Sequence, residues 1–180
     1  MYTLKIEIDN YPLNPRTEWD NATHMAFFHN RYTLGDSDVP FNSDDFDSWE
    51  KIKKHIKNHL DAVCLPVYIY DHGGVSISTT PFSCRWDSGQ IGFVYMTRDE
   101  IRKAYGVKRI TKAVLEKAYT LMQAEIDVYD AYLRGDVYGY IIEDEDGNEV
   151  SSCWGFYGYD YCQQAGQAEL DQLNAKLKAA

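Results

Sequence analysis

The densest group of potentially reactive side chains lies between residues 69 and 95, within and between β-like runs. A thiol, an imidazole and a carboxylate stand close together there, at Cys84, His72 and Asp87. These three side-chain types can supply a cysteine nucleophile, its base and an orienting group. Asp71 is a poorer orienting group for His72, because consecutive residues of a strand point to opposite faces. If the chain is an enzyme, we therefore expect Cys84, His72 and Asp87 to be catalytic.

The competing interpretation of this segment is structural. A cysteine is often buried in a β core, and Asp and Ser side chains often hold turns through local hydrogen bonds. A thiol of ordinary pKa is also a poor nucleophile unless a base or a cation lies beside it. The sequence contains no phosphate-binding GxxxxGK[ST] loop and no GxSxG elbow. The sequence therefore favours a chain that is not an enzyme.

The same segment also carries candidates for ligand binding. Residues 51–112 hold eleven basic and five acidic residues, net +6, whereas residues 1–50 are net −7 and residues 113–180 are net −9. An anionic ligand is therefore favoured there over a metal ion, with Arg85 and Trp86 of this segment and Arg31 of the preceding one as ligand candidates. Arginine pairs with phosphate, and an aromatic ring can stack on a base. This pattern leaves open a protein that sequesters a signalling nucleotide.

Metal binding is not predicted. His55 and His59 are four residues apart on one face of a lysine-rich helix, a spacing that metal sites use. No glutamate completes an HExxH pattern, and the nearby lysines repel cations. We expect a surface histidine pair, no metal and no cofactor.

Carboxylates gather in the last third of the chain. Five of them flank a predicted hairpin turn, and three more lie on the preceding helix: Glu143, Asp144, Glu145, Asp146 and Glu149, then Glu125, Asp127 and Asp130. The segment lacks the twelve-residue EF-hand pattern. A solvated turn is one interpretation of these residues, and a contact for the basic groove of a partner protein is the other.

Composition limits the classes of function. The chain has 180 residues and a net charge of −10, so direct nucleic-acid binding is disfavoured. No signal peptide and no membrane-spanning stretch are visible, and the four cysteines form no CxxC pair. We expect a cytoplasmic protein with reduced thiols and no membrane partner. An oligomer remains open.

The pattern of apolar residues predicts one α+β domain over residues 1–180. Its mainly antiparallel sheet has about five to six strands and packs against three to four helices. Strands are expected over 3–9, 63–70, 75–80, 91–97, 137–143 and 150–157. Helices are expected from residues 43–45 to Leu60, over 97–106, 111–134 and 160–178. Residues 10–43 should be irregular, or contain a short helix near residues 21–31.

Several short motifs resemble a family of small accessory proteins of bacteriophages and mobile elements. They are Trp19-Asp20-Asn21, His29-Asn30-Arg31-Tyr32 with Leu34-Gly35-Asp36, Tyr70-Asp71-His72-Gly73, residues 81–90 and residues 153–158. The resemblance implies no catalytic role. It implies a protein made in an infected bacterium and directed at host defence. Together with the carboxylates and fifteen tyrosines, it favours an acidic, tyrosine-rich inhibitor of a nucleic-acid-targeting defence protein or nuclease complex.

Overall fold

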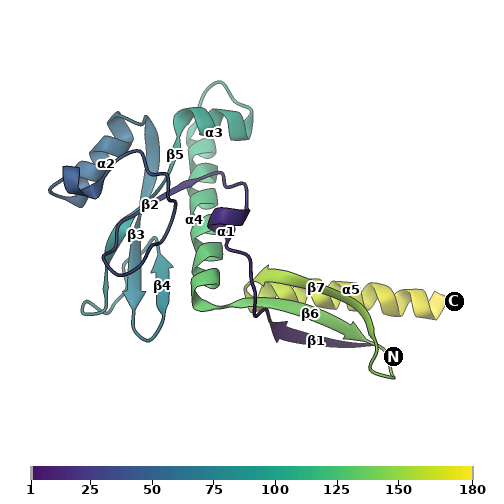
Figure 1. Cartoon of the computed structure of the whole chain (residues 1–180). Helices are drawn as coiled ribbons and strands as arrows, with labels where there is room; N and C mark the ends of the chain where they lie inside the picture. Colours follow the sequence, from purple (N-terminus) through teal and green to yellow (C-terminus); the bar gives the residue numbers. More distant parts are fainter. Residues whose placement is uncertain (1, 180) are drawn as a thin grey trace. The chain divides into compact units, whose positions relative to one another are not determined.

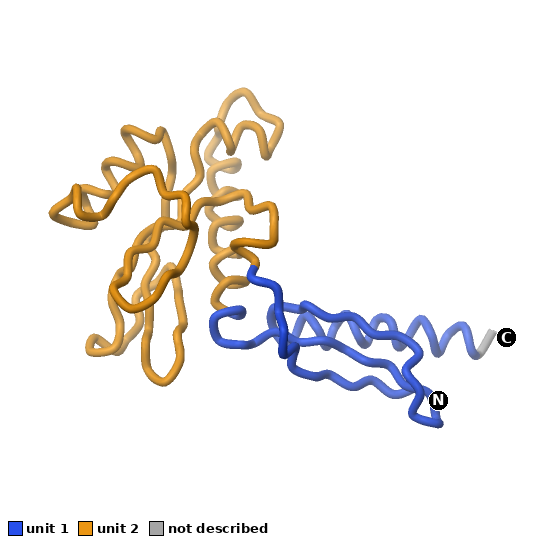
Figure 2. The backbone as a smooth tube through the Cα atoms, in the orientation of Figure 1, with its two compact units in different colours: residues 1–14, 131–180 blue, residues 15–130 orange. Residues whose placement is uncertain are grey.

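The computed structural model describes residues 2–179 and confirms the α+β class. The described chain contains seven strands in two antiparallel sheets and five α-helices. The predicted strands and helices are therefore present, but the strands form two sheets (Figure 1). By its internal contacts the chain divides into two compact units. Unit 1 comprises residues 1–14 and 131–180, and unit 2 comprises residues 15–130 (Figure 2).

The sheet of unit 2 is built around one central strand. Its order is β2 (His24–Phe27), β5 (Ser88–Thr97), β3 (Ala62–Asp71) and β4 (Val75–Ser78). Residues 91–96 of β5 are all buried. A strand buried on both faces has an almost continuous apolar sequence, and here the sheet has helices on both sides (Figure 1).

Helix α2 (Trp49–Asn58) covers one face of this sheet. Ile52 and Ile56 are buried against Phe93 and Tyr95, as the predicted helical stripe requires. On the other side lies α4 (Lys112–Arg134), whose final residues from 131 onward belong to unit 1. Its buried face includes Ala118, Met122 and Ile126.

Local signals set the ends of α3 (Arg98–Tyr105). The Thr97 side chain accepts a hydrogen bond from the backbone N–H of Glu100, and the Glu100 carboxylate accepts one from the backbone N–H of Thr97. This capping box satisfies N–H groups that have no partner within the helix. Gly106 ends the helix in the left-handed conformation, with φ of 62°. Both ends agree with the sequence.

Unit 1 is a three-stranded sheet with a helix on one face. The strands are β1 (Thr3–Ile8), β6 (Val137–Glu143) and β7 (Glu149–Tyr157), with β6 in the centre, and the helix is α5 (Tyr159–Ala179). Tyr140, Ile142 and Cys162 form the buried core. Gly166 lets the helix approach closely, because a Cβ there would lie 2.7 Å from Leu4 Cδ1.

Residues 10–48 differ from the prediction in two ways. The expected short helix near residues 21–31 is wrong: α1 (Pro15–Glu18) lies earlier, and β2 lies in that range. Met25 and Ala26 are fully buried in β2, which pairs with β5, so tertiary pairing determines the conformation there. The N-cap of α2 is Ser48, while Ser43–Asp45 form a separate 3-10 turn, η1.

No helix in the described part of the chain combines the length and apolar character needed to cross a membrane.

Candidate functional site

The three predicted catalytic side chains do meet, with Cys84 and Asp87 in the loop between β4 and β5 and His72 in the turn between β3 and β4. The Cys84 thiol donates a hydrogen bond to Asp87 Oδ2 at 3.6 Å, and His72 Nδ1 lies 3.2 Å from the same oxygen. The backbone holds this loop against the end of β3, since Asp71 N–H donates to Asp87 O at 2.8 Å. Asp87 is therefore the centre of the group, as the residue between the thiol and the imidazole.

This order of contacts differs from that of a cysteine nucleophile. In such a site the imidazole contacts the thiol and takes its proton, while the carboxylate orients the imidazole. Here the carboxylate contacts both of the other groups. The arrangement therefore suits a hydrogen-bonded loop better than nucleophilic catalysis.

The other three cysteines differ in burial. All four cysteines are free thiols. Burial raises the pKa of Cys64 to about 11 and also raises that of Cys162. Cys153 is exposed on β7.

Two of the three ligand candidates line one cavity of about 380 Å³ in unit 2, although they are far apart in sequence. Arg31 comes from the segment that follows β2, and Trp86 from the loop that precedes β5. Arg31 Nη1 donates to Asp71 Oδ2 at 2.9 Å, and Tyr32 Oη donates to Asp71 Oδ1 at 3.0 Å. Arg85 is exposed beside Trp86 in the sequence. Sequence spacing alone does not indicate this pairing of loops.

The predicted acidic hairpin of unit 1 is present, with its carboxylates in different roles. Asp144 holds the turn, because its Oδ1 accepts hydrogen bonds from Asp146 N–H at 2.9 Å and Asn148 N–H at 2.8 Å. These contacts with Asn148 and Asp146 hold the pKa of Asp144 below its usual value. Glu143 is paired with Lys5 on β1, at 2.6 Å. The side chains of Glu145, Asp146 and Glu149 are exposed, and Glu149 Oε1 accepts a hydrogen bond from Ser152 Oγ at 2.6 Å.

The predicted extension of this acidic surface onto α4 needs correction. Asp130 Oδ1 accepts hydrogen bonds from Ser76 Oγ and from Ile77 N–H, both at 2.7 Å. Glu125 lies in an internal ion-pair cluster. Only Asp127 is exposed, and it accepts a hydrogen bond from Gln123. Glu125 and Asp130 thus hold unit 2 together and do not form a free acidic surface.

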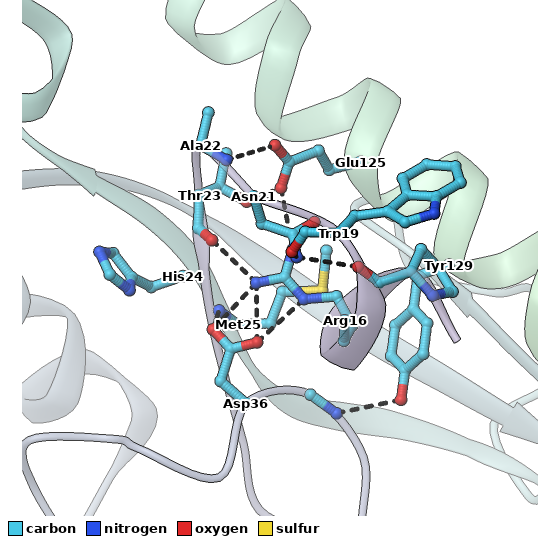
Figure 3. Close-up of polar contacts among 12 residues, drawn as sticks. Arg16, Trp19, Asn21, Ala22, Thr23, His24, Met25, Asp36, Glu125 and Tyr129 are labelled. Atoms are coloured by element: carbon cyan, nitrogen blue, oxygen red, sulfur yellow. Dashed lines mark hydrogen bonds and ion pairs between the residues drawn. The ribbon is translucent and has the colours of Figure 1, made fainter. Parts of the chain in front are cut away.

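The cluster around Glu125 is centred on Arg16, which sequence reasoning did not identify (Figure 3). The Arg16 side chain is only 3% exposed. Its guanidinium forms a two-pronged contact with Asp36 at 2.7–2.9 Å, contacts Glu125 Oε2 at 2.9 Å and donates to Thr23 O at 2.8 Å. An arginine fork matches carboxylate geometry in this way. We refer to Arg16, Asp36 and Glu125 as the Arg16 cluster.

The Arg16 cluster fixes the irregular N-terminal part of unit 2 onto α4. Glu125 also accepts hydrogen bonds from Ala22 N–H at 2.9 Å and from Thr23 Oγ at 2.6 Å. Asp36 Oδ2 accepts one from Met25 N–H at 2.8 Å. The sequence does hold one indication of this role, because Arg16 is the only lysine or arginine between Lys5 and Arg31. Its partners, however, lie 20 and 109 residues away.

The histidine pair on α2 is stacked, with the His55 and His59 ring centroids 4.7 Å apart. His55 also packs edge-on against Phe41 and Phe46. Within residues 2–179, no three His, Cys, Asp or Glu side chains are grouped so that they could hold a metal ion.

Comparisons of the chain with protein-family models, curated proteins and solved structures find no match.

Proposed function

We propose that this chain acts by binding a protein partner, as a phage-type accessory protein that inhibits a bacterial nucleic-acid-targeting defence system. The contact surface is the exposed acidic tip of the β6–β7 hairpin. Such a tip can occupy a basic groove in which the partner holds nucleic acid, because carboxylates there take the place of phosphates.

The observation that supports this proposal best is the internal bracing of the hairpin tip. Asp144 accepts hydrogen bonds from Asp146 and Asn148, and its own N–H donates to Asn148 O at 2.9 Å. A turn fixed before binding loses little conformational entropy on contact. Glu145 and Asp146 are therefore presented on a prearranged support, as a recognition surface requires.

The test is affinity purification of the tagged full chain from bacteria, with identification of its partners, followed by binding measurements over a range of salt concentrations. Glu145→Lys combined with Asp146→Lys should weaken the complex about tenfold or more, mainly through a slower association rate. Asp20→Lys with Glu116→Lys is the control, since it changes the net charge equally at exposed positions outside the hairpin. Binding that is insensitive to salt, or equal loss in both variants, would contradict the proposal.

A cysteine-dependent hydrolase or transferase is a second candidate, favoured by the proximity of Cys84, Asp87 and His72. It requires that Cys84 react with a thiol probe at neutral pH faster than exposed Cys153. It also requires that Cys84→Ser abolish the biological effect. A variant with full effect would remove this candidate.

A further inference from the structure

The cavity that contains Arg31 and Trp86 has features that the proposed protein contact does not use. Its volume of about 380 Å³ falls in the range of small-molecule sites. Its walls come from two loops, from the end of β3 and from the start of β5, where Gln90 and Ile91 lie. We call it the Arg31–Trp86 cavity.

Trp86 is the first feature that points to a ligand. This residue is 96% exposed, whereas Trp19 and Trp154 are each 44% exposed. A large aromatic ring left in water forgoes the free energy that its burial would release. Such a ring at the edge of a cavity can regain that energy by stacking on a planar ligand, and a nucleobase offers a stacking face whatever its identity.

Arg31 is the second feature. Its side chain is 71% exposed, yet it is anchored by Asp71 at 2.9 Å and lies over the Tyr32 ring, 5.4 Å from its centroid. A guanidinium has five N–H donors, and the contact with Asp71 uses Nη1. Donors thus remain for the oxygens of a phosphate, which arginine binds well.

The carboxylates at the cavity do not rule out an anion. Asp71 is already paired with Arg31, and Asp87 Oδ2 lies 3.2 Å from His72 Nδ1. Arg85, next to Trp86, adds a positive charge at the loop surface. Near Arg31 the formal charges of the two arginines, Arg31 and Arg85, therefore balance those of Asp71 and Asp87. Gln90 offers amide donors and acceptors to the edge of a base.

We propose that the Arg31–Trp86 cavity binds a free nucleotide, with the base stacked on Trp86 and the phosphate held by Arg31. This inference goes beyond the acidic hairpin and concerns a different unit of the chain. A free nucleotide is favoured over a polynucleotide because the chain carries a net charge of −10, which repels a repeated phosphate backbone.

The experiment is isothermal titration of the purified full chain with the four 5′-mononucleotides, the matching nucleosides and inorganic phosphate. At least one mononucleotide should bind, and more tightly than its nucleoside or phosphate alone. Trp86→Ala should weaken both nucleotide and nucleoside by about 5- to 150-fold, the range for loss of one stacking contact. Arg31→Gln should weaken the nucleotide about tenfold and leave the nucleoside unchanged, because only the nucleotide carries a phosphate.

Matched controls are Trp154→Ala and Arg102→Gln, which alter an exposed tryptophan on β7 and an arginine on α3 whose side chain is 40% exposed. Both should bind nucleotide as the parent chain does. The proposal is overturned if no mononucleotide binds at about 1 mM, the weak end of specific affinity. It is also overturned if Trp86→Ala binds unchanged, or if affinity for oligonucleotides rises with their length.

The hairpin variants separate the two proposals. Glu145→Lys with Asp146→Lys should leave nucleotide binding intact, and Trp86→Ala should leave capture of the protein partner intact. Failure of the nucleotide proposal can thus be distinguished from failure of the protein-binding proposal. Loss of nucleotide binding in the hairpin variant would overturn the assignment to the cavity.

Discussion

Removal of the positive charge at Arg16 tests how unit 2 holds its N-terminal segment. Arg16→Met keeps most of the side-chain volume and removes the guanidinium. Asp36 and Glu125 then lose the positive charge that they share. Their side chains are only 19% and 17% exposed, so water cannot fully replace it. An ion left without its partner in such surroundings is poorly solvated by water or protein.

The expected cost follows from these contacts. Breaking a buried ion pair from one side typically costs about 3–5 kcal/mol. The lower end applies here, because Asp36 keeps a hydrogen bond from Met25 N–H and Glu125 keeps those from Ala22 and Thr23. We expect a loss of about 3 kcal/mol. For a chain of this size that lowers the melting temperature by about 6–12 °C.

Thermal unfolding followed by circular dichroism measures this cost, and hydrogen exchange locates it. Amide protection should fall in β2 and at Asp36, and remain in unit 1. Arg102→Met is the matched control, because Arg102 makes only an exposed contact with Asp99 on the same helix. Such a surface pair contributes about 0–1 kcal/mol.

A double variant tests whether loss of the ion pair with Glu125 causes the loss of stability in Arg16→Met. Glu125→Gln removes the negative charge, keeps one acceptor oxygen for Ala22 N–H and turns an amide donor toward Thr23 Oγ, which can accept. Combined with Arg16→Met, it should cost about 1–3 kcal/mol less than the sum of the two single changes. If the effects simply add, or if Arg16→Met costs no more than Arg102→Met, then the Arg16 cluster is not what holds this segment.

Other predictions concern close packing and thiol chemistry. Gly92→Ala should destabilise unit 2 strongly in urea unfolding, because the new Cβ would lie 1.9 Å from Ala26 O, whereas Gly89→Ala meets nothing within 4 Å and should be tolerated. Iodoacetamide at pH 8 should modify exposed Cys153 in the folded chain and spare Cys64, whose pKa burial raises to about 11. Equal labelling of the two would contradict this. Because the pKa of Cys64 is higher in the folded state than its ordinary value of 9.0, its contribution to stability is complete below pH 9 and is lost as pH rises through 11. A Cys64→Ser variant should therefore show a weaker decline in stability over that range.

Much of the fold was predictable because local chemistry specifies it. The capping box at Thr97 and the glycine at position 106 fix both ends of α3 through contacts within a few residues. Gly73 has a φ of 70° in the turn between β3 and β4, a backbone conformation that glycine adopts without strain. The stripe that contains Met122 and Ile126 likewise predicts the buried face of α4.

The candidate sites show what local signals cannot supply. The sequence indicated Glu125 and Asp130 as contacts for a protein partner, and Arg31 and Trp86 as contacts for a ligand. It could do so because charge and aromatic character are properties of the residue itself. Whether each side chain is free to contact a ligand or a protein partner depends on residues of the same chain that are distant in sequence. Glu125 forms an ion pair with Arg16, and Asp130 accepts a hydrogen bond from the backbone of β4. Arg31 and Trp86, in contrast, line the same cavity.

The sequence by itself thus determined the class of fold, most of its elements and the chemistry that each side chain can perform. Only the tertiary structure decided which charges are neutralised internally and which remain for a ligand. The physical reason is that capping, turn formation and helical periodicity act over a few residues. Ion pairing, desolvation and the formation of a cavity depend instead on segments brought together by folding.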